Sequence, residues 1–134
     1  MKKIICAILS MMMFFSLAFA EVDLKSMGTA DLQALYAKVV MELLSRTDTS
    51  VELTQGIWVV GRDIPSGRYN LKADNVIVSV YKSEDSAIDE VYSEMRSYYT
   101  LSSLIGSNEV GNLTLREGEA VSIEIGNVKF TRLN

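Results

Sequence analysis

One stretch of the sequence decides the fold class: VSIEIGNVKFT, residues 121–131. Apolar and polar residues alternate before Gly126-Asn127, from Val121 to Ile125, and again after it, from Val128 to Phe130. Alternation with period two is typical of a strand with one buried face. Since two residues separate the runs, and Gly-Asn suits a tight turn with positive φ, the sequence predicts a β-hairpin that turns at Gly126-Asn127.

Two further short connections favour antiparallel strands. Asp74-Asn75 separates Tyr69–Leu71 from the alternating run Val76–Tyr81, and Glu117-Gly118 separates Leu113–Leu115 from Val121. These links leave no room for crossover helices, so four or five strands follow one another. The sequence therefore predicts a mainly β (α+β) fold, an antiparallel β-sandwich or small barrel preceded by one amphipathic helix.

The helix is predicted over Thr29–Arg46. Five apolar residues recur there at spacings of three and four and share one face: Leu32, Leu35, Tyr36, Val39 and Leu43. Val40 and Leu44 make the apolar surface wider than packing on one sheet needs. We expect the helix and a polar linker over residues 21–50 and a β-sandwich-like domain over residues 51–134. Between Ser83 and Gly106 the period is mixed, and we expect a loop with at most one helical turn, then a strand at Tyr98–Leu101.

The first twenty residues have the three parts of a secretory signal peptide. Lys2 and Lys3 give a positive start, residues 4–17 are apolar and uncharged, and Ala18 and Ala20 are small residues where a signal peptidase reads the chain. The apolar run is shorter than the roughly 20 residues that span a bilayer. We therefore predict an exported protein, periplasmic or extracellular, that begins at Glu21, is soluble after signal-peptide removal and does not insert into a membrane.

The most distinctive motif is VVGRDIPSGRY, residues 59–69. Pro65 fixes its own φ and holds Ile64 extended, and Pro65-Ser66-Gly67 fits the last three positions of a type I turn. We expect a sharp corner between two strands, with Ile64 inserted into the core. Asp63 can accept hydrogen bonds from backbone N–H groups of the turn or pair with Arg62 or Arg68. A backbone role is favoured over a ligand site, because proline and glycine explain such a corner without a ligand.

This motif resembles one in a family of exported bacterial domains of unknown function, in which a strand ending in Val-Gly is followed by Asp-Ile-Pro-Ala-Gly and a Tyr-bearing strand. Ser66 stands where that family has alanine. The stretch Leu115–Glu119 is similar to the Leu-x-x-Gly-Asp turn before the family's last strands, and the resemblance covers roughly Leu24 to Phe130. It implies a secreted or envelope-associated β-rich domain and supplies no catalytic residues.

Composition excludes several kinds of chemistry. The chain has no histidine, and its one cysteine, Cys6, lies in the predicted signal peptide. Ser-His-Asp and Cys-His catalysis are thereby excluded, and zinc lacks its preferred ligands. The formal net charge of −4 becomes −6 when Lys2 and Lys3 are removed, and no basic run exists. Because phosphates would be repelled, we predict no nucleic-acid partner, and we predict no catalytic residue, metal or cofactor.

Aromatic side chains remain as candidates for ligand contact, since flat rings with polar edges suit sugar stacking. Trp58 and Tyr81 lie in alternating strands and are expected in the core. Tyr98 and Tyr99 are the best candidates for exposure, because neighbouring strand residues point to opposite faces. The predicted ligand-binding residues are Tyr98, Tyr99, Asp63 and Arg68.

Two classes of function fit these observations. The first, which we favour, is a non-catalytic binding or interaction module of the cell envelope or extracellular space, whose partner is an unknown protein or glycan. The second is a structural or assembly protein that forms homo-oligomers through its helix, since the helix offers a wide apolar surface.

Overall fold

The computed structural model describes residues 23–46 and 49–133, and the chain divides into two units, Met1–Leu32 and Gln33–Asn134. In the first unit, the described residues form a turn, where the Ser26 N–H donates to the Asp23 carbonyl, and the start of helix α2 (Thr29–Ser45). The predicted signal peptide, residues 1–20, lies outside the described residues. No helix in the described part of the chain is both long and apolar enough to cross a membrane.

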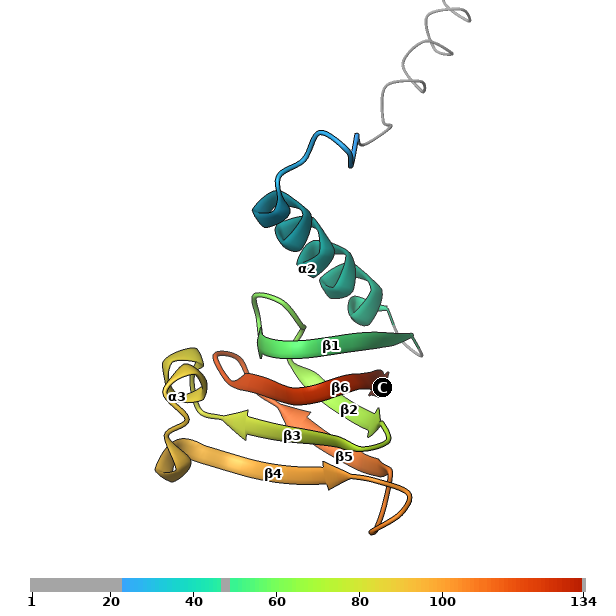
Figure 1. The fold of residues 1–134 in the computed structure, drawn as a ribbon, viewed down its shortest axis with the longest axis vertical. Coiled ribbons are helices and arrows are strands. Elements are labelled where there is room, and N and C mark those ends of the chain that lie inside the picture. The colour runs from blue at the N-terminus through green and yellow to red at the C-terminus, as the bar shows by residue number, and fades with distance from the viewer. Residues whose placement is uncertain (1–22, 47–48, 134) are drawn as a thin grey trace, which may run out of the picture. The chain divides into compact units, whose positions relative to one another are not determined.

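The second unit contains the rest of α2 and a curled antiparallel sheet, a half-barrel (Figure 1). Its strands follow the order β4-β3-β6-β2-β5, and β1 pairs with the other edge of β6. The elements are β1 (Ser50–Val59), β2 (Gly67–Lys72), β3 (Val76–Tyr81), α3 (Glu84–Ile88), a 3₁₀ turn (Tyr92–Glu94), β4 (Met95–Leu101), β5 (Glu109–Leu115) and β6 (Ala120–Leu133). The predicted mainly β, α+β fold is confirmed.

The predicted hairpin at Gly126-Asn127 is wrong, because β6 runs through this pair as one bent strand. Gly126 does have the positive φ, +78°, that a turn would need. It uses this conformation in a bulge, where the register with β1 shifts between Thr54 and Gly56. The bulge also shifts the alternation of β6, so Ile125, expected on the buried face, is 60% exposed.

The bend in β6 explains why the sheet curls. Strands β2 and β3 follow one another along the same edge of β6: β2 pairs with Lys129–Leu133 and β3 with Ala120–Ile123. The predicted short connection at Asp74-Asn75 is confirmed, but it joins two successive partners of β6 rather than a hairpin. Strand β5 then adds to β2, and β4 adds to β3. The sheet thus has two arms, β2 with β5 and β3 with β4. The arms meet where Arg96 Nη2 of β4 donates to the Thr114 carbonyl of β5 at 2.6 Å.

One main core fills the curl. All six strands contribute buried side chains, including Leu53, Trp58, Tyr69, Leu71, Val78, Val80, Leu101, Leu113, Leu115, Val121, Ile123, Val128 and Phe130. The Tyr69 and Phe130 rings pack edge to face, with centroids 5.9 Å apart. A smaller cluster of Tyr81, Ala87 and Ala120 lies under α3. Burial of apolar side chains is the main stabilising term for a chain of this kind.

Helix α2 agrees with its predicted bounds to within one residue, but its buried face is narrower than its apolar surface. Val40 and Leu44 are buried in the core. Tyr36, Val39 and Leu43 remain 42%, 47% and 37% exposed. The helix therefore carries apolar surface beyond what the sheet covers.

The segment after β3 contains more helix than the single turn that the sequence predicts, and the strand follows it as expected. Helix α3 has five residues, and the Ser83 hydroxyl caps it by accepting from the Ser86 N–H at 3.2 Å. The 3₁₀ turn follows, and the strand predicted at Tyr98–Leu101 is present as β4, which begins three residues earlier at Met95.

Candidate binding site

The corner after β1 is closed by its own backbone. The N–H groups of Asp63 and Ile64 donate to the Val59 carbonyl at 2.8 and 3.3 Å, and the Gly61 N–H donates to the Ile64 carbonyl at 2.7 Å. This hydrogen-bonded turn lies at Gly61–Asp63, and Ser66 forms a bend. Ile64 is fully buried, as predicted. The corner therefore anchors the chain between β1 and β2.

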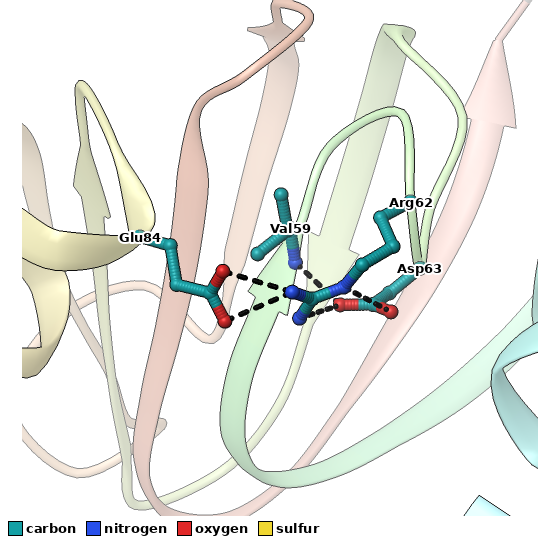
Figure 2. Close-up of polar contacts among 4 residues, drawn as sticks. All are labelled: Val59, Arg62, Asp63 and Glu84. Atoms are coloured by element: carbon teal, nitrogen blue, oxygen red, sulfur yellow. Dashed lines mark hydrogen bonds and ion pairs between the residues drawn. The ribbon is translucent and has the colours of Figure 1, made fainter. Parts of the chain in front are cut away.

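Asp63 is the polar centre of the corner, and Figure 2 shows its partners. Asp63 is buried, and its Oδ2 accepts a hydrogen bond from the Val59 N–H at 2.9 Å. Arg62 Nε and Nη2 donate to the two carboxylate oxygens of Asp63 at 3.0 and 2.8 Å. The prediction allowed Asp63 either a backbone partner or an arginine, and it has both.

Arg62 also reaches α3, where its Nη1 donates to both carboxylate oxygens of Glu84 at 3.0 and 2.8 Å (Figure 2). The hydrogen bond with Asp63 is the main cause that raises the pKa of Arg62 above its ordinary value. Two carboxylates thus face one guanidinium, and the cluster of Arg62, Asp63 and Glu84 has a formal charge of −1 when all three side chains are ionised.

A groove lies between α2 and β1, next to this corner. It consists of two adjoining hollows of about 350 and 380 Å³, and both are lined by Gln33, Ala37, Arg62 and Asp63. The first hollow is completed by Tyr36 and by residues 54–58 of β1. The second is completed by Ala34 and Lys38 of α2. We call the two hollows together the α2–β1 groove.

Two aromatic rings form one wall of the α2–β1 groove. Tyr36 and Trp58 contact each other edge to face, with ring centroids 5.7 Å apart. Trp58 Nε1 donates to the Thr54 carbonyl at 3.0 Å, and the Tyr36 hydroxyl donates to the Glu52 carbonyl at 3.1 Å. Trp58 is buried, as predicted, whereas Tyr36 keeps much of its ring in solvent. The polar ends of both rings are satisfied within the protein, so their orientation is set before any ligand arrives.

The amide side chains of Gln33 and Gln55 are two polar groups of the groove that face solvent. Both residues are exposed, and neither amide is hydrogen-bonded to another described residue. An amide offers two N–H donors and one carbonyl acceptor. Small residues leave the space open beside them, because Ala37 has only a methyl group and a Cβ built on Gly56 would meet no atom within 4 Å.

Most of the ionisable side chains of the groove have partners within the protein. The ionisable residues of the groove other than Lys38 and Tyr36 are Arg62 and Asp63, which are bonded to each other. General acid–base catalysis needs a titratable group free to reach a substrate proton. Within residues 23–46 and 49–133, no three His, Cys, Asp or Glu side chains are placed to hold a metal ion.

The structure does not bring the four predicted site residues together. Tyr98 and Tyr99 lie on β4, where Tyr98 is 52% exposed and Tyr99 packs against the core. Arg68 lies on β2, opposite Thr114 and Leu133, and Asp63 lies in the corner. Strands β2 and β4 are not neighbours in the sheet. Of the four residues, only Asp63 lines the groove.

Sequence reasoning missed Gln33, Tyr36 and Gln55. The sequence places Tyr36 in the apolar stripe of the helix, but the exposure of Tyr36 depends on which face of α2 the sheet covers. The two glutamines carry no local signal, because their shared hollow forms only when α2 lies beside β1.

Comparison of the chain with known protein families, with curated proteins and with solved structures finds no match. The resemblance of residues 59–69 to exported bacterial domains stays a prediction.

Proposed function

We propose that this chain is an exported, non-catalytic binding module of the cell envelope or extracellular space, and that the α2–β1 groove is its contact site. One observation carries the proposal: the unpaired amides of Gln33 and Gln55 lie in one hollow with the exposed ring of Tyr36. Concave sites that combine aromatic surface with a few polar groups are the usual form of a small-molecule site. The signal-peptide pattern of residues 1–20 supports the exported setting.

The charged residues of the groove support binding over catalysis. Arg62 is held by Asp63 and Glu84, and Asp63 is held by Arg62 and the Val59 N–H. A nucleophile or base in this position would have to break these contacts before it could act. The groove therefore offers recognition without a reacting group.

Trp58 gives a direct readout of the groove, because it is the only tryptophan of the chain. We would titrate a panel of soluble oligosaccharides and short peptides and follow the fluorescence of Trp58. Ala37→Leu places a larger side chain in both hollows, and the helix should tolerate it because the helix propensity of leucine is close to that of alanine. Ala30→Leu makes the same change on the same helix outside the groove and serves as the control.

At least one member of the panel should change the fluorescence of the parent protein and of Ala30→Leu, while Ala37→Leu should respond at least about tenfold more weakly. A panel without any response, or an equal response from Ala37→Leu, would remove the groove as the contact site.

A second function, assembly through α2, is favoured by the exposure of Val39 and Leu43 beside Tyr36. Light scattering over a concentration series separates the two functions. A dimer that dissociates on dilution, and that is lost in a Val39→Gln, Leu43→Gln double variant, would support assembly. A monomer at every concentration would leave the binding module as the function.

A further inference from the structure

We infer that the α2–β1 groove takes a neutral, hydroxyl-rich ligand, a short saccharide that stacks on Tyr36 and hydrogen-bonds with Gln33 and Gln55. The inference rests on the proposed function and names the chemical class of ligand for the same site.

Charge is the first reason. The one arginine of the groove is already neutralised by two carboxylates at 2.8 Å. Burying an anionic ligand beside Asp63 would bring like charges together, and one Lys38 at the rim offsets only one of them. A cationic ligand would have to compete with Arg62 for both carboxylates. A neutral ligand avoids both costs.

Hydrogen-bonding capacity is the second reason. A sugar hydroxyl both donates and accepts, and so does a side-chain amide. Gln33 reaches the groove from α2 and Gln55 from β1, so the two amides approach a ligand from opposite walls. The N–H groups and carbonyls of these amides can satisfy neighbouring hydroxyls without any change in ionisation.

The aromatic wall is the third reason. The Tyr36 hydroxyl is bonded to the Glu52 carbonyl, and the edge-to-face contact with Trp58 fixes the ring. The C–H face of a sugar ring packs well on a flat aromatic surface of this kind. Because the ring is already ordered, little side-chain entropy is lost when a ligand binds.

The size of the groove favours a short ligand. Hollows of about 350 and 380 Å³ lie at the lower end of the range of roughly 300 to 1,000 Å³ that is usual for small-molecule sites. A bound peptide of several residues would need more room or a row of free backbone groups. One to three sugar units match the space of the two hollows and their chemistry better than an extended peptide.

The experiment uses calorimetry and Trp58 fluorescence on the full mature chain. The probes are neutral trisaccharides (maltotriose, cellotriose and N-acetylated chitotriose), an anionic one (trigalacturonate), a cationic one (chitosan trimer) and a set of short peptides. At least one neutral probe should bind, and raising the salt from about 50 to 500 mM should change its Kd less than about twofold, because no charge pair forms.

Variants place the ligand within the groove. Tyr36→Ala and Gln55→Ala should each weaken binding about tenfold or more, while Tyr36→Phe keeps the ring and stays within about threefold of the parent. Tyr98→Ala removes a tyrosine outside the groove that is somewhat more exposed than Tyr36, 52% against 42%, and should leave the Kd unchanged. Urea melts confirm that each variant is folded.

The outcomes separate this inference from the proposed function. Binding of only the charged saccharides, or of only peptides, with loss in Ala37→Leu, would overturn the saccharide class and leave the groove as a binding site. If a neutral saccharide binds, and Tyr98→Ala abolishes this binding while Tyr36→Ala does not, the groove is not the binding site. Absence of any response in the whole panel would overturn both.

Discussion

The corner at Val59–Gly67 and the α2–β1 groove share Asp63, yet their polar groups differ in one respect. In the corner, the carboxylate of Asp63 and the N–H groups of Gly61 and Ile64 all have partners within the protein. In the groove, the amides of Gln33 and Gln55 are not hydrogen-bonded to any described residue. A buried polar group with its bonds made serves the fold, whereas an exposed one beside a fixed aromatic ring is available to a ligand. Loss of stability should therefore follow changes in the corner, and loss of binding should follow changes in the groove.

The largest effect is expected for Ile64→Ala. Ile64 has no exposed surface, and truncation of a buried isoleucine usually costs about 2 to 5 kcal/mol. Ile125→Ala is the matched control, because Ile125 is mostly exposed and should cost about 0.5 kcal/mol or less. Urea unfolding measures both. Equal stability of the two variants would contradict the anchoring role of the corner.

The second-largest effect is expected at alkaline pH, which should lower the contribution of the corner to stability. Burial raises the pKa of Tyr69 to about 12, and its hydroxyl donates to the Pro65 carbonyl. The folded state holds this proton more tightly than the unfolded state, whose tyrosine has a pKa near 10. The contribution of Tyr69 to the free energy of unfolding is therefore complete below about pH 10 and is lost as the pH rises to about 12. The total loss is up to roughly 3 kcal/mol.

Tyr69→Phe tests this directly, because phenylalanine cannot ionise. Urea melts between pH 8 and pH 12 should show a shallower alkaline loss of stability in Tyr69→Phe than in the parent. The raised pKa of Tyr81, which is also due mainly to burial, should leave part of the loss in both proteins. Identical pH profiles would mean that Tyr69 titrates normally in the folded chain.

Asp63→Asn should have an intermediate effect of about 1 to 3 kcal/mol, since it weakens the bond from the Val59 N–H and removes the ion pair with Arg62. Glu84→Gln is the comparison. It removes only the exposed contact to the same arginine and should cost about 0 to 1 kcal/mol. A larger loss in Glu84→Gln than in Asp63→Asn, by thermal or urea unfolding, would reverse our assignment of the anchor.

The smallest effects on stability are expected at the groove. Gln33→Ala and Gln55→Ala change exposed side chains without internal bonds and should each alter the free energy of unfolding by about 0.5 kcal/mol or less. Ser66→Ala should be equally mild, because Ser66 lies in a bend of the corner and none of the corner's hydrogen bonds uses its side chain. A loss above about 1 kcal/mol in either glutamine variant would show that the amides serve the fold.

The sequence predicted what depends on local periodicity and backbone chemistry. The α2 bounds and the buried Ile64 follow from spacing and from Pro65, and the structure contains both. Strand β3 is present where the alternating run predicts it, but Ser79 and Tyr81 are buried as well, so the expected single buried face is wrong for this strand. Gly126 shows where this reasoning ends, because a positive φ serves a bulge as well as a turn. Only the long-range pairing of β1, β2 and β3 with β6 makes it a bulge.

The groove was beyond local prediction for a related reason. Its walls come from α2 and β1. Tyr36 is exposed because Val40 and Leu44 are the residues of α2 that pack into the core. Tyr98 was correctly expected to be exposed, but its position on β4 separates it from Asp63 and Arg68. The alternation of a strand predicts whether an aromatic ring is exposed. It does not predict which polar side chains lie around that ring, because their grouping depends on the fold.

The most direct test of the account is a ¹H–¹⁵N spectrum of residues 21–134, recorded during titration with the neutral trisaccharide that binds most tightly. The chain has two glutamines and one tryptophan, so their side-chain N–H signals are few, and Gln33→Ala and Gln55→Ala assign the two amides by loss of signal. We predict that the Gln33 and Gln55 amide signals and the Trp58 indole signal shift together, while the backbone signals of Ile64 and Ser66 and those of Tyr98 and Arg68 stay in place. Shifts confined to the corner or to β4, with both glutamine amides unmoved, would contradict the assignment of the groove as the binding site.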